Sequence, residues 1–311
     1  MSFVEVKNLT KTFKSTIAVD DLSFSVEQGE IFGLLGPNGA GKSTTLSILS
    51  GLLAPTSGDA MVAGISVARR PLQVKQMLGV VPQEIALYPK LSAKANLKFW
   101  GEVYGMKGKA LETRIEEVLD LVGLSARANE QVAKYSGGMK RRVNIAAGIL
   151  HKPRLLVMDE PTVGVDPQSR NHIFDLVKRL NSEGATVIYT SHYMEEVELL
   201  CNRVAIVDQG KLVALGTVEE LLRQAAEHQE VEIGGTQVSA DLLNRLQAIP
   251  VISQVKQEEQ GVRLITDDAE KALALAFGCF VGAGLKVSRI EIRKPNLEGL
   301  FIKLTGKSLR D

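Results

Sequence analysis

A glycine-rich run that follows an apolar stretch is the part of this sequence with the clearest chemistry. It fits the spacing G-x-x-x-x-G-K-[ST], and together with the next residue it consists of Gly36, Pro37, Asn38, Gly39, Ala40, Gly41, Lys42, Ser43 and Thr44. Glycines let a loop curl so that successive backbone N–H groups face inward and bind phosphate oxygens. The motif therefore predicts a nucleotide-binding loop, in which Lys42 reaches the β- and γ-phosphates and Ser43 ligates Mg²⁺.

Two adjacent carboxylates end a second apolar run, Leu155–Met158. In enzymes with this type of phosphate loop, such a strand lies beside the strand that leads into the loop, and its aspartate joins the Mg²⁺ shell. Asp159 is the candidate for that role. Glu160 follows directly, where a carboxylate can orient and deprotonate an attacking water. The pair predicts that the bound nucleotide is hydrolysed.

A Ser-Gly-Gly turn narrows the class of enzyme. The run Tyr135-Ser136-Gly137-Gly138-Met139 opens a helical pattern and resembles the signature loop of ABC-transporter ATPases, which is usually Leu-Ser-Gly-Gly-Gln. This chain keeps Ser136, Gly137 and Gly138 and departs from the family at Tyr135 and Met139. The resemblance implies that the three kept residues bind ATP, because a helix start that presents backbone N–H groups is an anion site.

Other motifs of the same family follow in the expected order over residues 2 to about 225. By resemblance, Gln83 is the Q-loop glutamine, a catalytic residue and Mg²⁺ ligand. Asp166 lies in the D-loop and contacts the nucleotide, and His192 is the switch histidine of the catalytic site. Phe13 stands where the family commonly has a tyrosine that stacks on adenine, and a phenyl face stacks as well. The resemblance implies an ATP hydrolase that uses Mg²⁺, with Lys42 and Glu160 in its catalytic site.

A finer resemblance concerns transport. The segments 138–142, 161–167 and 295–306 resemble the ATPases of bacterial drug-resistance exporters of the daunorubicin type. Those proteins pair with a separate ABC-2-type transmembrane permease, so the resemblance implies such a permease as partner and a drug-like or lipid-like substrate. It also implies a peripheral position on the cytoplasmic face of the cell membrane. The segment from roughly Leu87 to Tyr104 is the expected contact with the permease.

The number of nucleotide-binding motifs in the chain predicts how many chains assemble. The chain has one phosphate loop and one signature loop, and in the family the signature loop faces the γ-phosphate bound by a second subunit. Two chains arranged head-to-tail would therefore complete two sites. We expect a homodimer that sandwiches two ATP molecules.

The fold class that these motifs imply is α/β. Apolar strands at Glu30–Leu35, Leu155–Met158 and Thr186–Thr190 are separated by helical patterns, which indicates a parallel sheet covered on both faces. Parallel strands end at one rim, from which His192 could sense the γ-phosphate. We predict an ABC-type phosphate-loop NTPase domain over residues 1–228, with a helical subdomain at about 88–150 and an antiparallel β subdomain.

Residues 229–311 carry no phosphate-binding motif and are predicted to form a small α+β accessory domain. Their strand and helix patterns follow the order βαββαβ plus a final helix, which is ferredoxin-like. In the first domain, Ala93–Val122 reads as one helical pattern, with Trp100 and Tyr104 predicted in the core. The basic run Lys140–Arg142 is predicted to be a solvated face.

Composition excludes some functions. Lys and Arg (37) nearly cancel Asp and Glu (36), so the net charge of +1 argues against a nucleic-acid partner bound through bulk charge. The two cysteines have no metal-ligand spacing and are expected to be free thiols. The longest uncharged apolar stretch, Ala272–Leu285, has 14 residues and is too short to span a membrane. We therefore expect no direct membrane span, and any membrane role to come through a partner.

Two alternatives within the resembled family stay open. The first is a non-transport ABC ATPase that acts on ribosomes or DNA, although soluble members of the translation class carry two cassettes in a chain and DNA-repair members carry a long coiled coil. The second is an importer ATPase, whose carboxy-terminal domain is typically a small β-barrel, unlike the βαββαβ order predicted here. A phosphate-loop kinase or GTPase is disfavoured by the Ser-Gly-Gly loop and by the Asp159-Glu160 pair.

Overall fold

The computed structural model of the protein describes residues 2–225, 229–235, 238–258, 261–293 and 296–305. The chain divides into two compact units, the first ending at Val218 and the second beginning at Glu219. The predicted boundary lay at 228/229, so the division comes earlier in the chain, at the start of a helix that the structure groups with the second unit. Residues 295 and 306, the two ends of the exporter-like tail segment, lie outside the described residues.

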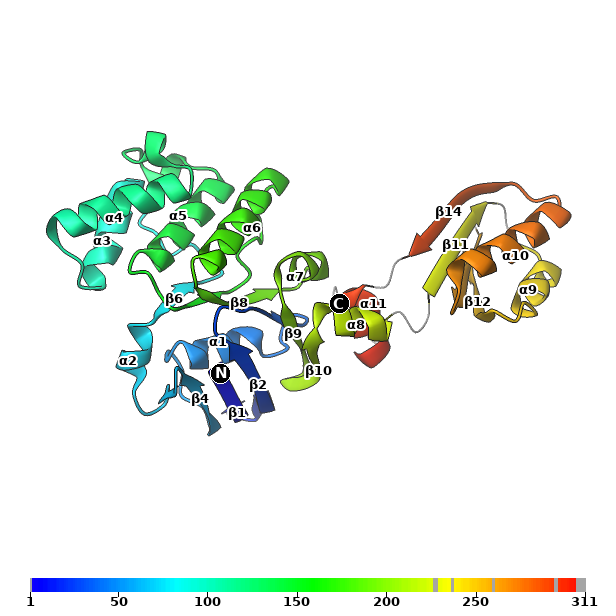
Figure 1. The fold of residues 1–311 in the computed structure, drawn as a ribbon, viewed down its shortest axis with the longest axis horizontal. Coiled ribbons are helices and arrows are strands. Elements are labelled where there is room, and N and C mark those ends of the chain that lie inside the picture. The colour runs from blue at the N-terminus through cyan, green and yellow to red at the C-terminus, as the bar shows by residue number, and fades with distance from the viewer. Residues whose placement is uncertain (1, 226–228, 236–237, 259–260, 294–295, 306–311) are drawn as a thin grey trace. The chain divides into compact units, whose positions relative to one another are not determined.

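A mostly parallel six-stranded sheet forms the centre of the first unit (Figure 1). Its strands lie in the order β10-β9-β3-β8-β7-β6, and only β10 runs antiparallel to its neighbour. The strands are β3 (Ile31–Leu35), β6 (Leu78–Val81), β7 (Leu155–Met158), β8 (Thr186–Ser191), β9 (Arg203–Asp208) and β10 (Lys211–Thr217). Every residue of β3, β7 and β8 is buried, which confirms the prediction of a sheet covered on both faces.

An antiparallel sheet lies beside it in the order β2-β1-β4-β5, as predicted for the β subdomain. Its strands are β1 (Ser2–Phe13), β2 (Thr16–Glu27), β4 (Ser57–Val62) and β5 (Ile65–Ser66). Helix α1 (Lys42–Leu49) packs in the same hydrophobic core as both sheets through Leu46, Ile48 and Leu49. Because α1 is anchored on two sides, the phosphate loop that precedes it is held between two rigid elements.

The remaining helices of the first unit are α2 (Pro71–Lys75), α3 (Ala93–Val103), α4 (Gly108–Leu121), α5 (Gly137–Ile149), α6 (Pro167–Ser182) and α7 (Met194–Leu200). Among them, α3, α4 and α5 form the helical subdomain, and the others lie outside residues 88–150 (Figure 1). The helical pattern predicted over Ala93–Val122 is interrupted, because Gly105 and Gly108 adopt positive φ angles of 80° and 60°. These left-handed residues end one helix and begin the next, so the chain can fold α3 against α4.

The aromatic pair Trp100 and Tyr104 does not lie in the core. Tyr104 is exposed and Trp100 is half-buried, with its indole N–H donating to Ala86 O at 3.2 Å. The core prediction was wrong because the apolar face of α3 that packs on α4 and α5 is made instead by Ala93 and Leu97. The two aromatic rings therefore remain on a solvent-accessible side of the helical subdomain.

The second unit contains a four-stranded antiparallel sheet in the order β12-β13-β11-β14. Its elements are α8 (Val218–Ala225), β11 (Gln229–Gly235), α9 (Ala240–Gln247), β12 (Ile252–Glu258), β13 (Gly261–Thr266), α10 (Ala269–Gly282), β14 (Val287–Arg293) and α11 (Leu297–Thr305). This order of strands and helices is the ferredoxin-like βαββαβ arrangement with one helix before it and one after it. Among the described residues, no helix has both the length and the apolar composition of a membrane span.

Candidate nucleotide-hydrolysis site

The glycine-rich loop lies between β3 and α1 and has a backbone path that requires glycine. Gly39 and Gly41 have φ angles of 80° and 99°, in the left-handed region. A Cβ on Gly41 would lie 2.4 Å from Ala18 O, and one on Gly36 would lie 2.2 Å from Val207 O. The loop therefore packs closely against neighbouring backbone, and a side chain at Gly36 or Gly41 would clash with it and distort the loop.

Lys42 turns its ammonium group back into the loop that it ends. Its Nζ donates to Gly36 O at 2.8 Å and to Pro37 O at 3.0 Å, and it lies 3.3 Å from Glu160 Oε1. The side chain is only 4 % exposed. A buried ammonium group needs such partners, and a phosphate anion in the loop could take the place of the weaker ones. The lysine therefore joins the loop to the predicted catalytic carboxylate.

Glu160 is the point at which the predicted catalytic residues meet. Gln83 Nε2 donates to Glu160 Oε2 at 3.3 Å, and His192 Nδ1 lies 3.2 Å from the same oxygen. Gln83, Glu160 and His192 follow β6, β7 and β8, which are neighbouring parallel strands. The expected gathering of strand ends at one rim is therefore what brings these three side chains and Lys42 together.

Thr190, which was not predicted as a site residue, contacts both acidic residues. Its Oγ1 donates to Asp159 Oδ1 at 2.7 Å and accepts from the Glu160 backbone N–H at 2.9 Å. Thr190 is fully buried at the end of β8, and Glu160 has a positive φ of 44°. The sequence signal was present, because a hydroxyl residue ends the strand that leads to His192, but only the strand order shows that it faces the carboxylates.

The proposed Mg²⁺ ligands have suitable donor atoms. Ser43 offers an exposed hydroxyl, Asp159 a partly exposed carboxylate and Gln83 an amide oxygen. Mg²⁺ favours oxygen ligands and is commonly bound by one or two carboxylates together with substrate phosphates. Within the described part of the chain, no cluster of three or more His, Cys, Asp or Glu residues could hold a metal ion. The donor atoms of Ser43, Asp159 and Gln83 are all oxygens and fit Mg²⁺.

The signature-loop residues form a second group, at the starts of two packed helices. Ser136 caps α5, and its Oγ accepts from Met139 N at 3.2 Å. Asp166 caps α6 by accepting from Ser169 N at 2.9 Å, and this hydrogen bond holds the pKa of Asp166 below its usual value. A Cβ on Gly138 would lie 2.1 Å from Ser169 Oγ, so the glycine allows the two helix starts to touch.

This second group is separate from the carboxylate site in a single chain. Ser136, Gly137 and Asp166 are exposed, and no hydrogen bond or ion pair among the described residues joins them to Lys42 or Glu160. Phe13 is also exposed, with the Lys11 ammonium 5.1 Å from its ring centre. The chain thus brings together Lys42, Gln83, Asp159, Glu160 and His192, and it does not bring the signature loop to them.

Arg141 corrects the prediction that the basic run in α5 is a solvated face. Its guanidinium is 4 % exposed and donates through Nη1 to Pro82 O at 2.7 Å and through Nη2 to Gln83 O. Burial lowers the pKa of Arg141. Asn144, one turn later, accepts from Ala86 N at 3.1 Å. Helix α5 therefore fixes the segment that carries Gln83, a role that the sequence pattern does not reveal.

We expect the variant Arg141→Gln to lower the free energy of unfolding by about 2 kcal/mol, because two backbone carbonyls lose a charged donor. ATP turnover should fall at least about tenfold, since Gln83 is then less well positioned. Urea unfolding and steady-state hydrolysis measure the two effects. Arg142→Gln is the control, because the Nη1 atom of Arg142 donates to Val122 O, away from the site. Unchanged turnover in the Arg141 variant would show that it does not position Gln83.

Comparison with known proteins gives one family. Residues 19–163 match the model of the ABC transporter family. The chain is 44 % identical over 310 residues to the linearmycin resistance ATP-binding protein LnrL of Bacillus subtilis, with 99 % of this chain and 100 % of that protein covered. It is 38 % identical to a Nod factor export ATP-binding protein I of Cupriavidus metallidurans, with 100 % and 99 % covered.

Solved structures agree with the fold. An ATP-binding subunit of an ABC transporter is 30 % identical, with a TM-score of 0.66 over 72 % of this chain and 93 % of that one. An ATP-binding cassette that was solved as a dimer in a post-hydrolysis state with ADP and Pi is 28 % identical, with a TM-score of 0.64 over 69 % and 98 %. The match to these cassettes fits the first unit and supports the predicted fold class.

Proposed function

The chain belongs to the ATP-binding proteins of ABC transporters and is an ATP hydrolase, and we propose that it powers export of a drug-like or lipid-like substrate through a separate ABC-2-type permease. The observation that carries the proposal is the length of the similarity. Two relatives whose names state resistance or export match over 99 % or more of each chain, and thus over the second unit as well as the cassette. The second unit is ferredoxin-like and not the small β-barrel expected of an importer ATPase.

The hydrolytic step that we propose is attack of water on the γ-phosphorus of ATP, with cleavage of the bond to the β-phosphate oxygen. Backbone N–H groups of the loop and Lys42 hold the phosphates, and Lys42 gives up its contact with Glu160 to do so. Glu160 then orients the water and accepts its proton, and His192 and Gln83 hold the water and the phosphate in line. Ser43, Asp159 and Gln83 would hold Mg²⁺, which would supply positive charge against the phosphates.

A homodimer would complete each site. In one chain the starts of α5 and α6, with Ser136 and Asp166, are exposed and do not contact Lys42 or Glu160. Their backbone N–H groups and helix dipoles suit an anion. We propose that they meet the γ-phosphate held by a second copy, so that two ATP molecules join two chains and hydrolysis releases them.

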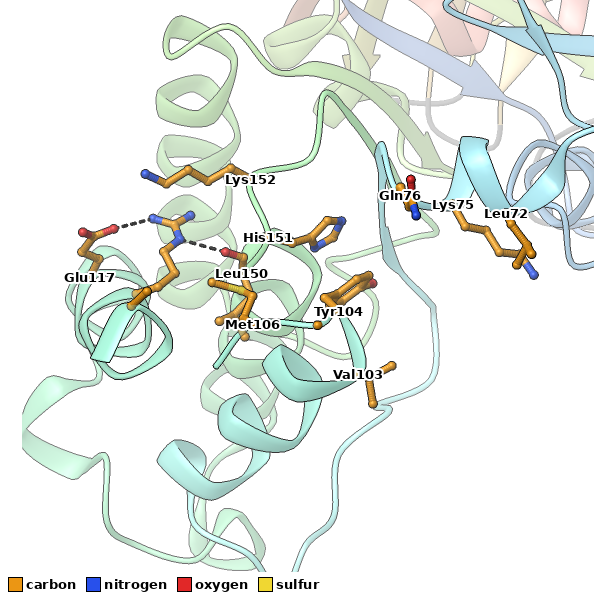
Figure 2. Close-up of a pocket in the computed structure, with 13 residues that line it drawn as sticks. Leu72, Lys75, Gln76, Val103, Tyr104, Met106, Glu117, Leu150, His151 and Lys152 are labelled. Atoms are coloured by element: carbon orange, nitrogen blue, oxygen red, sulfur yellow. Dashed lines mark hydrogen bonds and ion pairs between the residues drawn. The ribbon is translucent and has the colours of Figure 1, made fainter. Parts of the chain in front are cut away.

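The permease would contact the helical subdomain. A pocket of about 1030 Å³ opens between α2, the end of α3 and the loop after α5, and Figure 2 shows the residues that line it. Tyr104 stacks there on His151 with ring centres 3.7 Å apart, and His151 Nε2 lies 2.8 Å from Leu78 O. Val103 and Leu72 leave apolar side chains exposed at the pocket. Such a hollow, with apolar and charged side chains in its walls, fits a short amphipathic helix of a membrane protein.

We expect Val103→Glu to abolish copurification with the permease and to leave ATP hydrolysis by the isolated chain unchanged. Val103 is 60 % exposed at the last residue of α3, so we expect the charge to affect docking and not folding. Coexpression with the permease followed by membrane fractionation measures retention. Leu199→Glu is the control, because Leu199 is equally exposed on α7 but does not line the pocket. Normal retention of the Val103 variant would move the contact elsewhere.

The transport proposal itself is tested by the location of the chain. Membranes should retain the protein when the permease is coexpressed and should lose it when the permease is absent, which would show that the permease holds the chain at the membrane. Retention on ribosomes or DNA in both cases would favour a non-transport ABC ATPase. Substrate accumulation inside cells, and not loss from them, would favour an importer.

A further inference from the structure

The sheet of the second unit has two edge strands of different character. In the order β12-β13-β11-β14, the strands β12 and β14 each have one neighbour among the described strands. On β12 the exposed side chains are polar, namely Ser253, Gln254, Lys256 and Gln257. Polar and charged side chains, lysine above all, protect an edge from pairing with another chain. The β12 edge is protected in this way.

The β14 edge carries apolar side chains instead. Its register pairs Ile290 with Ile233 and Ile292 with Val231 on β11. Opposite residues of an antiparallel pair lie on the same face, and Ile233 and Val231 are fully buried in the core of the unit. Ile290 and Ile292 therefore lie on the face that packs against helices, yet they are 44 % and 42 % exposed. The apolar face of the sheet continues past the helices that cover it.

Helix α10 of the same unit also exposes apolar side chains. It packs on β11 and β13, whereas α9 packs on β12. A Cβ on Gly282 would lie 3.9 Å from Nη2 of Arg245, which belongs to α9. The Gly282 side of α10 therefore faces α9. Phe277 and Val281, at helical spacing, lie on other sides of α10 and are exposed. Together with Ile290 and Ile292 they form what we term the β14 surface.

The sequence of β14 is complementary to itself. Within one chain Arg289 already forms an ion pair with Glu291, two residues further along β14. In an antiparallel pair of two β14 strands centred on Ile290, each Ile290 would face its own copy, and Arg289 would also face Glu291 of the other strand. The two-fold axis repeats that pair, so two oppositely charged pairs would form. A register shifted to centre on Glu291 would place like charges opposite each other. Of these two registers, only the first is favourable on both faces of the strand.

We propose that the β14 surface is a dimer contact, in which a second copy of this chain pairs its β14 antiparallel to the first, centred on Ile290. The contact joins two four-stranded sheets into one and covers the exposed isoleucines. It does not need nucleotide, so it differs from the ATP-dependent contact of the cassettes. This contact would keep the two chains together after hydrolysis. Two chains that stay joined through their second units keep a high effective concentration when the cassettes separate after hydrolysis.

A charge-exchange experiment on the full chain without nucleotide tests this register. Arg289→Glu places like charges opposite each other in both cross-strand pairs, and so does Glu291→Arg. We expect each variant alone to raise the dimer dissociation constant at least about tenfold, measured by analytical ultracentrifugation. An equimolar mixture of the two variants should form heterodimers again, because every cross-strand pair is then of opposite charge. A loss of folding in either variant cannot produce this rescue.

The matched control is Lys256→Glu on β12, which should leave the dimer unchanged. A second measurement uses Ile290→Cys, because only a residue on the two-fold axis faces its own copy. Oxidation should give a covalent dimer at position 290 and none for Lys256→Cys. The proposal is overturned if the unmodified chain is monomeric without nucleotide, if the mixed variants fail to associate, or if the cysteine at 256 cross-links instead. ATP-dependent association of the cassettes is measured separately and does not decide this outcome.

Discussion

The variant Glu160→Gln should bind ATP normally and hydrolyse it at least about 10²-fold more slowly, the lower end of what a general base contributes. Glutamine has almost the same shape as glutamate, and its amide oxygen can still accept from Gln83. It cannot take a proton from water at neutral pH. Nucleotide binding should persist, because the phosphate loop and Lys42 are unchanged, and Lys42 keeps its bonds to Gly36 O and Pro37 O.

The same variant should accumulate as a dimer when ATP is present. If ATP joins two chains and hydrolysis releases them, a chain that cannot hydrolyse ATP stays joined. Phosphate release measures turnover, and light scattering with and without ATP measures the dimer. Glu195→Gln, an exposed substitution three residues beyond His192, is the control and should behave like the unmodified chain. Normal turnover in the Glu160 variant would remove Glu160 as the base.

Most of the carboxylate site could be predicted because parallel strands order their own ends. Glycine spacing located the phosphate loop, and apolar strands located Asp159 and His192. Since β6, β7 and β8 are neighbours, residues 83, 160 and 192 meet although they are far apart in the chain. In such a sheet, local patterns determine a long-range contact. The ferredoxin-like order of the second unit followed from the succession of short strand and helix patterns along residues 229–311.

What escaped prediction depends on packing between elements. The local sequence around Arg141 is typical of a solvent-exposed helix face. Its side chain is buried only because α5 packs against the segment after β6, where the guanidinium donates to two backbone carbonyl groups. The contacts of Thr190 with the two acidic residues depend on the pairing of β7 with β8, which local sequence patterns do not reveal. Trp100 and Tyr104 have core-like spacing, but the neighbouring helices meet a different side of α3. In each case the residue type and spacing were compatible with two environments, and a distant element decided between them.

The variant Lys42→Ala should lower ATP affinity about 10- to 100-fold, because a charged hydrogen bond to phosphate contributes roughly 1.5–3 kcal/mol. It should also destabilise the nucleotide-free chain. Lys42 and Glu160 are 4 % and 7 % exposed, with 3.3 Å between Nζ and Oε1, so removing the lysine leaves a buried carboxylate without its main counter-charge. Breaking a buried ion pair in this way costs about 3–5 kcal/mol.

The double variant Lys42→Ala/Glu160→Gln separates these two effects. With neither charge present, no buried ion is left unpaired, and the free energy of unfolding should return most of the way to that of the unmodified chain. ATP affinity should stay as low as in Lys42→Ala, because the phosphates still lack the ammonium group. Urea unfolding without nucleotide and titration calorimetry with ATP measure the two quantities. Unchanged affinity in Lys42→Ala contradicts the phosphate-loop assignment, whereas a double variant as unstable as the single one contradicts the buried ion pair. Each outcome bears on one interaction of the same lysine, so loss of folding and loss of nucleotide binding cannot be confused.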